Sequence, residues 1–446
     1  MAHTIEPDAV NAPTSKRRSL VASTVGNVLE WYEWSAYAVF APFIAAVMFS
    51  QDDPVSALLS TFAVFAVGFL MRPLGGIVFG RIADRRGRKF VLITTMLMMA
   101  GGSFAIGIMP TYESIGAFAS LLLLLARMVQ GFAHGGESAT ANTYVAEIAP
   151  PNRRGMWGSI VFVAIFGGSV LAYTVGGVIT ASTSESAVGE WGWRIPFLIG
   201  GVAALVVLVL RRGMEESEVF ADGNAPAGGT PAAESAPVVE VPRSQVVRGI
   251  VLVIAMTSGI TAAHYTWTSY VSTYAIAEQG MAASSAYWMS VIAQALALAS
   301  LPLWGRFSDR VGRRPVLLAF AVAMIVLQFP LMGLISDQPW TLLVAATLAL
   351  VVVAMPGALL SSTMSEVFPT RVRTQAIGFA YSISVAVFGG SAPYLNQLLN
   401  NLGIGWASSL YIVVLCVATG VAVWLLPETK GIDLATAGST PRRVRR

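Results

Sequence analysis

Charged residues are scarce in this chain. Asp, Glu, Lys and Arg make up 12% of its 446 residues, hydrophobic residues make up 55%, and the mean hydropathy is +0.67. An ordinary globular chain carries about twice as much charge, roughly a quarter of its residues. The few charges are clustered and leave apolar runs of about 20 residues, the length that crosses the roughly 30 Å hydrocarbon core of a bilayer. The composition therefore excludes an ordinary water-soluble domain and predicts an integral membrane protein.

Cysteine and histidine are almost absent. The chain has one cysteine, Cys416, and three histidines, so an intrachain disulfide is impossible. These few side chains supply neither a metal cluster nor the nucleophile–base pair that a membrane enzyme would need. The sequence also has no Walker-type phosphate-binding loop, which argues against an ATP-driven pump. We therefore expect a protein that is not an enzyme and that holds no metal and no cofactor.

Lysine and arginine are missing from every second connection between the apolar runs. The connections around 50–56, 110–113, 181–192, 278–283, 336–339 and 400–404 contain none, whereas the alternate connections and both chain ends contain clusters. By the positive-inside rule, this distribution places both termini in the cytoplasm. It also explains the net charge of +4 without a nucleic-acid partner. The expected spans are 20–49, 57–80, 90–109, 114–146, 156–180, 194–212, 248–278, 283–305, 315–335, 339–365, 374–399 and 405–426.

The chain contains two related halves. Residues Gly80–Lys89 and Gly305–Arg314 repeat one glycine- and arginine-rich pattern between apolar runs. Repeated sets of helices joined by charged turns are typical of secondary transporters. The sequence therefore predicts an all-α membrane protein with 12 transmembrane helices in two six-helix bundles. Its expected parts are a cytoplasmic tail (1–18), an N-terminal bundle (19–212), a flexible cytoplasmic linker (213–247), a C-terminal bundle (248–428) and a second cytoplasmic tail (429–446).

The repeated motif and the segment Arg127–Gly131 resemble the loop and fourth-helix motifs of the major facilitator superfamily. Three further stretches resemble its metabolite:proton symporter family, which includes permeases for α-ketoglutarate, citrate, shikimate and proline or betaine. They are Gly26–Glu33, Met71–Gly76 and Glu190–Pro196. The α-ketoglutarate permease branch is the most similar, through Tyr112–Gly116, Leu121–Arg127, Tyr265–Tyr270 and Gly389–Ala392.

This resemblance implies alternating access, H⁺ as the coupling ion and a multi-pass protein of the inner (plasma) membrane. We also expect the chain to function as a monomer. The sequence departs from the family at several informative positions. Glu33 and Trp34 stand where the family more often has Asp and Phe. His134 interrupts a stretch that is usually small and apolar, and His264 stands where an apolar aromatic is expected. Met364 stands near a position where the α-ketoglutarate branch has a lysine, which weakens the case for a dicarboxylate.

Glu30 and Glu33 lie three residues apart in the first span, so they share a helix face that Trp34 and Tyr37 extend. A charge within the membrane costs about 2.5 to 3.5 kcal/mol on insertion scales, so a buried pair of carboxylates needs a partner or a function. We expect at least one of them to bind substrate or a proton. The alternative is that a glutamate merely pairs with an arginine.

Two arginines are also expected deep in the membrane. Arg72 lies nine residues before Arg81, about 13 Å into its span at 1.5 Å per residue. Its guanidinium can bind a carboxylate through two hydrogen bonds. A structural ion pair with Glu30 or Glu33 is an equally good interpretation.

A polar stripe follows one face of the fourth span. It consists of Arg127, Gln130, His134 and Glu137. We expect the stripe to line the central cavity, with His134 and Glu137 as a possible proton relay. The alternative is a seam of hydrogen bonds between helices.

The seventh span carries His264, Tyr265, Trp267 and Thr268. We expect His264 and Trp267 to face the same way. Such a group could form an aromatic cage for a quaternary ammonium, a polar wall for an organic acid, or ordinary packing.

The repeated loop motifs are expected to act as a conformational switch. The resemblance implies charge networks that hold one conformation and break in the other, and the alternative is that the arginines only set topology. The residues concerned are Gly80, Asp84, Arg85, Arg88, Glu147, Arg154, Gly305, Asp309, Arg310, Arg313, Glu366 and Arg373.

The function we expect is proton-coupled uptake of a small organic acid such as α-ketoglutarate. In this hypothesis Arg72 and Arg127 attract the anion, and Glu30 or Glu33 carries the proton. A proton-linked porter for betaine or proline is the alternative in the same class. A membrane sensor that kept the fold but does not transport is the alternative from another class.

Overall fold

The computed structural model describes residues 12–135, 145–146, 149–212, 242–370 and 372–434. Within these residues the regular structure is entirely helical. The first half contains α1 (Ala12–Val39), α2 (Ala41–Met48), α3 (Pro54–Leu70), α4 (Arg72–Arg86), α5 (Arg88–Ile108), α6 (Tyr112–Ile115), α7 (Ala117–His134), α9 (Arg154–Ser182), α10 (Glu185–Glu190), η1 (Gly192–Arg194) and α11 (Ile195–Arg212). The second half contains α13 (Arg243–Tyr265), η2 (Thr266–Tyr270), α14 (Val271–Ala277), α15 (Ala283–Val311), α16 (Arg313–Leu334), α17 (Pro339–Val367), α18 (Arg373–Ser384), η3 (Val385–Gly389), α19 (Ala392–Asn401) and α20 (Trp406–Leu425).

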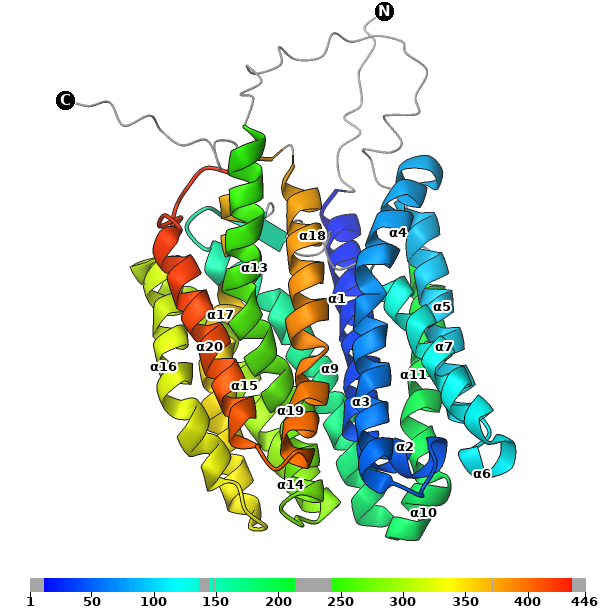
Figure 1. Ribbon diagram of the computed structural model, residues 1–446. Helices are drawn as coiled ribbons and strands as arrows, with labels where there is room; N and C mark the ends of the chain where they lie inside the picture. The colour runs from blue at the N-terminus through cyan, green and yellow to red at the C-terminus, as the bar shows by residue number, and fades with distance from the viewer. Residues whose placement is uncertain (1–11, 136–144, 147–148, 213–241, 371, 435–446) are drawn as a thin grey trace, which may run out of the picture.

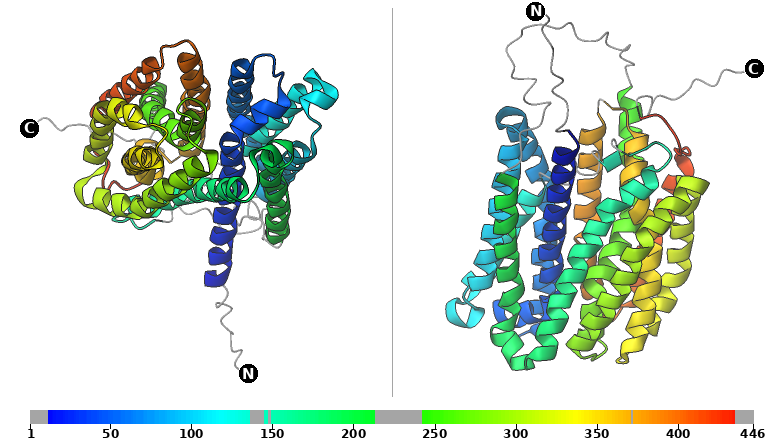
Figure 2. Two further views of the ribbon diagram at one scale, coloured as in Figure 1. Left: turned by 90° about the horizontal axis from the view of Figure 1, so that it is seen from below. Right: turned by 180° about the vertical axis from the view of Figure 1, so that it is seen from behind.

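The long helices run side by side in two groups, one from each half of the chain (Figure 1). Viewed along the helices, the two groups are distinct, with α9 and α1 near their boundary (Figure 2). The short helices α2, α6, α10 and α14 lie at one end of the molecule, while α4 ends and α13 and α18 begin at the opposite end (Figure 1). The charged connections therefore gather at one end, as the sequence predicts.

Eleven helical segments in the described residues are long and apolar enough to cross a membrane. They correspond to the second to twelfth predicted spans. The first predicted span is covered by α1 and α2, which are not among the eleven because α1 carries Glu30, Glu33 and the cations at 16–18. The predictions of an all-α membrane protein are confirmed.

Two predicted boundaries need correction. The predicted linker ends too late, because residues 243–247 already belong to α13. The second predicted tail starts too early, because Thr429 is buried and its hydroxyl donates to Glu366 of α17 at 2.6 Å. The rest of the linker, residues 213–241, lies outside the described residues.

Glycines allow the two halves to meet closely. A side chain on Gly305 of α15 would place its Cβ 2.6 Å from the carbonyl oxygen of Gly155, at the start of α9. The reverse substitution would bring a Cβ at Gly155 within 2.7 Å of the Gly305 oxygen. Small residues of this kind let membrane helices approach to backbone contact.

Two features of the backbone position the central residues. The second span breaks at Met71, between α3 and α4, where Pro73 lacks the N–H that a continuous helix would use. Arg72 is thereby the first residue of α4. The seventh span contains the π-helical turn η2, a form of helix that often marks functional sites. This turn follows directly on His264 and Tyr265.

Candidate functional site

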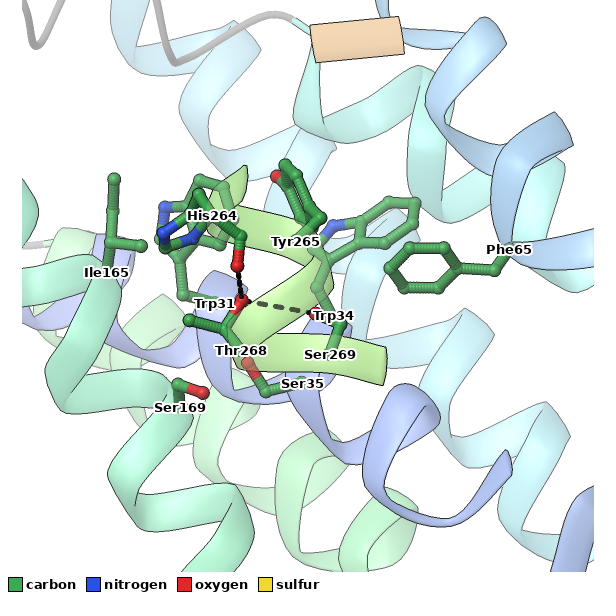
Figure 3. A pocket seen from close by; sticks show the side chains of 10 residues that line it. All are labelled: Trp31, Trp34, Ser35, Phe65, Ile165, Ser169, His264, Tyr265, Thr268 and Ser269. Atoms are coloured by element: carbon green, nitrogen blue, oxygen red, sulfur yellow. Dashed lines mark hydrogen bonds between the residues drawn. The ribbon is translucent and has the colours of Figure 1, made fainter. Parts of the chain in front are cut away.

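A small cavity lies between the two halves at mid-membrane. The first half contributes Trp31, Trp34, Ser35, Phe65, Ile165 and Ser169, and the second half contributes His264, Tyr265, Thr268 and Ser269 (Figure 3). The free volume is about 10 Å³, room for about one water molecule. This conformation is therefore closed around its centre.

Both buried arginines lie over the indole of Trp34. The guanidinium carbon of Arg127 is 4.0 Å from the ring centroid and that of Arg72 is 4.3 Å from it. Arg72 also lies 3.7 Å from the ring centroid of Phe69, and Arg127 lies 4.4 Å from that of Tyr37. Aromatic faces attract cations without neutralising them. Both positive charges are held in the membrane while they remain available to an anion.

Each of the two guanidinium groups keeps free donors. The Nε and Nη2 atoms of Arg72 and of Arg127 are buried and have no hydrogen-bond partner in the described part of the chain. Four cavity-lining groups share this property: the indole N–H of Trp34, the hydroxyls of Ser169 and Tyr265, and Nδ1 of His264. A buried polar atom without a partner carries a desolvation cost, which a ligand could remove.

Glu33 is connected to Arg127 through an amide. Arg127 donates from Nη1 to Oε1 of Gln130 at 2.9 Å, and Gln130 donates from Nε2 to Oε2 of Glu33 at 3.1 Å. The same Nε2 also donates to the Ser103 hydroxyl at 2.9 Å. The Gln130 side chain therefore uses its acceptor and its donors to join α7, α1 and α5.

Glu30 lies beside a histidine. Its Oε2 lies 3.4 Å from Nδ1 of His134, and both side chains are buried. The His134 ring stands edge-on to Trp31 and Trp34, with centroid distances of 5.7 and 6.0 Å. The indoles that carry the arginines therefore also pack against this acid–base pair.

The polar stripe of the fourth span consequently faces the first span. Since α1 and α7 run in opposite directions, Glu30 lies opposite His134, and Glu33 lies opposite Gln130. In this conformation Gln130 and His134 form the helix–helix seam that was the alternative to a cavity lining. Glu137, the last residue of the predicted stripe, lies outside the described residues.

Tyr37 supports the site without donating to it. Its hydroxyl donates to the backbone oxygen of Thr61 at 3.0 Å, and its ring is stacked with that of Phe65. Its remaining contribution is the aromatic face beneath Arg127.

The seventh span divides differently from the prediction. His264 and Tyr265 line the cavity, but Trp267 does not face the same way, because its indole N–H donates to Gln328 of α16 at 2.9 Å. The Trp267 side chain points toward α16 in the second bundle, and Thr268 and Ser269, one turn after His264 and Tyr265, line the cavity instead.

Comparison with known proteins agrees with this architecture. The model of the major facilitator superfamily matches residues 24–393. The chain belongs to the major facilitator superfamily. It is 33% identical to the α-ketoglutarate permease of Escherichia coli (strain K12) over 97% of this chain and 99% of the relative. It is 34% identical to the ectoine/proline transporter ProP of Corynebacterium glutamicum, over 96% and 87% of the two chains.

The fold of this superfamily member is also similar to a solved structure. The proton:xylose symporter XylE bound to 6-bromo-6-deoxy-D-glucose aligns with a TM-score of 0.75 at 18% identity, over 95% of this chain and 98% of the other. At that identity the likeness concerns the fold alone. The family and these relatives are transporters, so the chain is a multi-pass membrane transporter of small molecules and not a membrane enzyme.

In this superfamily member, the second copy of the loop motif ties the halves together at the charged end. The carboxylate of Asp309 accepts hydrogen bonds from the backbone N–H groups of Gly155 and Met156 at 2.8 and 3.0 Å. These amides belong to the first turn of α9, where the helix dipole favours a negative charge. Asp309 also pairs with Arg313 at 2.7 Å. One carboxylate thereby connects α15, α16 and the opposite half.

A second carboxylate extends this network. Glu366 lies 3.3 Å from Arg313 and 3.9 Å from Arg154, so it too joins cations of both halves. Arg373 donates instead to backbone oxygens, those of Phe368 at 3.2 Å and Leu434 at 2.7 Å. Arg310 is exposed, and its carbonyl oxygen accepts from Lys430 at 2.5 Å.

The first copy of the motif lies only partly within the described residues. Gly80 and Arg85 are exposed. The side chains of Asp84 and Arg88, and the whole of Glu147, lie outside the described part of the chain.

Sequence reasoning missed Glu428. Its carboxylate accepts from the backbone N–H groups of Arg313 and Arg314 at 2.8 and 3.1 Å, and from those of Thr429 and Lys430 at 3.0 and 2.9 Å. Burial raises the pKa of Glu428, but these four donors outweigh burial and hold the pKa below its ordinary value. Glu428 caps the N-terminus of α16 from a segment that follows the last span, so no sequence pattern near α16 could predict this contact.

Ser103 and Ser169 were also missed. Isolated serines in apolar spans carry little sequence signal, because most of them bond to their own helix. Only the packing of α5 and α9 against the centre gives these two a partner or a place in the cavity.

Proposed function

We propose that this transporter takes up a small organic acid together with protons by alternating access. The observation that carries the proposal is the pair of buried guanidinium groups over Trp34, whose free donors lie beside two buried glutamates. Two cations that the protein does not neutralise by direct contact favour an anionic ligand. The relatives add support, since one of them is an α-ketoglutarate permease.

The proposed roles follow from position. Arg72 and Arg127 bind the carboxylate of the substrate, and Glu30 or Glu33 carries the proton. His264, Tyr265 and Ser169 offer hydrogen bonds to the uncharged part of the ligand. His134 stands beside Glu30 as its proton partner. Trp267 has no direct role in this scheme, because its indole N–H donates a hydrogen bond to Gln328.

A porter for proline or betaine is the second candidate. The identity to the ectoine/proline transporter supports it, and so do the aromatic rings around the cavity. A quaternary ammonium, however, would need an open aromatic face, and the faces of Trp34 and Phe69 already carry Arg72. The carboxylate of a zwitterion could still bind the arginines, so the experiment must include both classes.

The test is substrate-induced pH change in proteoliposomes. The panel contains α-ketoglutarate, citrate, shikimate, benzoate-type acids, betaine and proline. External alkalinisation on adding an acid is the expected result, and Arg72→Gln should abolish it while the variant still inserts and folds. A response to betaine or proline alone would establish the second candidate. Undiminished uptake in Arg72→Gln would exclude the proposed role of that arginine, and silence of the whole panel would favour a sensor without transport.

We also propose the finer topology. The chain would have 12 transmembrane helices with α1 as the first, both termini in the cytoplasm, and residence as a monomer in the inner (plasma) membrane. The bundle of residues 19–212 and the C-terminal bundle, which begins with α13 at Arg243, would be the two moving bodies. Accessibility of engineered cysteines in intact cells tests the orientation: a cysteine in the connection at 50–56 should react with a membrane-impermeant reagent, and one at 81–89 should not.

The charge network around Asp309 is proposed as the cytoplasmic lock. It holds the ends of α15 and α9 together and must break for that side to open. The difference in the free energy of this charge network between the closed and open conformations shifts the populations of the two conformations.

A further inference from the structure

The two glutamates and two arginines form two parallel arms around Trp34. One arm runs from Glu33 through Gln130 to Arg127. The other contains Glu30 with His134, whose ring packs edge-on to Trp31 and Trp34, and Arg72 lies over these same two indoles. Both arms end at a guanidinium over the same indole. The site therefore repeats one unit twice: a carboxylate that can take a proton and a guanidinium with free donors.

We infer that each arm binds one carboxylate of a dicarboxylic acid and takes one proton in exchange, so that transport is electroneutral. This inference rests on the proposed function and adds the number of carboxylates, the number of protons and their pairing. In this arrangement a dicarboxylate does not require a lysine near Met364, because Arg72 and Arg127 supply one cation for each of its carboxylates.

The site lies in a medium of low polarity, where uncompensated charge is costly. With histidines counted as neutral, two ionised glutamates balance two arginines in the empty site. A bound dianion would leave two uncompensated negative charges, and like charges a few ångströms apart in such a medium repel strongly. Protonation of both glutamates restores neutrality. A dianion and two H⁺ then cross together, and the net charge moved is zero.

The surroundings of the arms allow this count. Besides the two histidines, the titratable side chains that face the four charges in the described residues are all tyrosines. They are Tyr32, Tyr37, Tyr265 and Tyr381. Within the described residues, neither ring nitrogen of His134 makes a hydrogen bond, although Nδ1 lies 3.4 Å from Oε2 of Glu30. His264 lies on the second-half wall of the cavity, outside both arms. Each arm has one glutamate and one guanidinium, so we expect the number of glutamates to set the number of protons.

The closed geometry supports a shared binding event. The amide oxygen of Gln130 accepts from Arg127, and its Nε2 donates to Glu33 and Ser103. A movement of Arg127 therefore changes the hydrogen bond that Gln130 donates to Glu33, and the reverse also holds. A ligand carboxylate that pairs with Arg127 weakens the guanidinium's hold on Gln130. We expect Glu33 to take its proton as that happens.

The test measures H⁺ and substrate fluxes together in proteoliposomes of the full chain. α-Ketoglutarate is compared with α-ketovalerate, which has the same chain without the distal carboxylate. For the wild type we expect two H⁺ per α-ketoglutarate and no response of the rate to a potential imposed with K⁺ and valinomycin. α-Ketovalerate should enter at least tenfold more slowly or with a single H⁺.

Glutamine variants separate the arms. Glu30→Gln and Glu33→Gln should each lower the ratio to one H⁺ per α-ketoglutarate, and an inside-positive potential should then accelerate uptake, because a net negative charge enters. Glu113→Gln is the matched control, since Glu113 is exposed on the short helix α6. It should leave the ratio at two.

Binding provides a measurement that does not require turnover. Calorimetry of α-ketoglutarate binding in two buffers of different ionisation enthalpy gives the protons taken up on binding. We expect two for the wild type, one for each single variant and none for the double variant. Glu113→Gln, the exposed control, should keep the value at two.

The failures are distinguishable. If no acid of the panel is taken up with protons, the proposed function fails. If an acid is taken up with protons, three results would overturn the two-arm inference alone. The first is a ratio of one H⁺ per α-ketoglutarate in the wild type, and the second is an unchanged ratio in both glutamine variants. The third is transport of monocarboxylates only.

Discussion

The guanidinium of Arg127 lies 4.0 Å from the centroid of the Trp34 indole, deep in the membrane and without exposure to solvent. The same ring carries Arg72 at 4.3 Å. Two like charges on one aromatic residue repel each other, so the empty site is held by packing and by the nearby glutamates. This arrangement is the physical reason to expect an anion between them.

Replacing Trp34 by leucine should weaken both stability and binding. Truncation of a fully buried tryptophan to alanine costs about 3 to 5 kcal/mol, and leucine keeps part of that packing, so the packing loss should be smaller. Each lost cation–π contact adds about 2 kcal/mol when it is desolvated. Thermal unfolding in detergent and substrate affinity both report the change, and we expect affinity to fall at least tenfold. Trp406→Leu is the control, because Trp406 is exposed. Unchanged affinity in the Trp34 variant would contradict the role of the ring.

Replacing Trp267 by phenylalanine should separate stability from transport. The variant loses the indole hydrogen bond and leaves the buried Gln328 oxygen without its donor, which should cost about 1 to 3 kcal/mol. The unfolding temperature should fall while the Michaelis constant for substrate stays within about twofold. A large rise of the Michaelis constant with normal stability would instead place Trp267 in the binding site.

Replacing Gly305 by alanine should prevent the closed state from forming. Its Cβ would lie 2.6 Å from the Gly155 carbonyl oxygen, and a backbone atom cannot move aside as a side chain could. We expect uptake to fall at least tenfold while the amount of inserted protein is unchanged. Gly333→Ala serves as the control, because a Cβ there meets no atom within 4 Å. Normal transport in the Gly305 variant would show that this helix contact is not needed.

Replacing Asp309 by asparagine should open the charged end of the molecule. A charge at a helix N-terminus contributes about 0.3 to 2 kcal/mol, so its loss should raise the open population by up to about 30-fold. The readout is maleimide labelling of Ser362→Cys in a Cys416→Ser background, since Ser362 is buried near the contact of α17 with α9. Asp337→Asn, on an exposed connection, should not alter the rate. Equal labelling rates in both variants would remove Asp309 from the lock.

Replacing Glu428 by glutamine should destabilise the protein in a pH-dependent way. Because the pKa of Glu428 is lowered in the folded state, its carboxylate stabilises the fold above the unfolded pKa of about 4.3 and loses this effect as the pH falls through the folded pKa. At neutral pH the variant should lose about 1 kcal/mol, as for the loss of a helix cap, and solvent screening keeps the effect modest. Thermal unfolding from pH 7 down to pH 3 should show the difference from wild type shrinking. A constant difference would mean that shape, not charge, matters at this position.

The sequence by itself determined the class of this protein. Its scarcity of charge, its apolar runs and its duplicated motif predict a helical membrane transporter, because the bilayer requires long apolar helices and the repeat requires two related bundles. The buried charges Glu30, Glu33, Arg72 and Arg127 were also identifiable, since charge within an apolar span is costly wherever it occurs.

Only the tertiary structure decided how those charges are paired. Gln130 joins Arg127 to Glu33, and His134 joins Glu30, because α1 and α7 pack in opposite directions at one relative height. Trp267 points away from the cavity to Gln328 of α16, and its spacing of three residues from His264 did not reveal this. Glu428 reached α16 from beyond the last span. Contacts of this kind depend on helix rotation, register and chain return, which are set by packing across the whole molecule and not by the residues near each position.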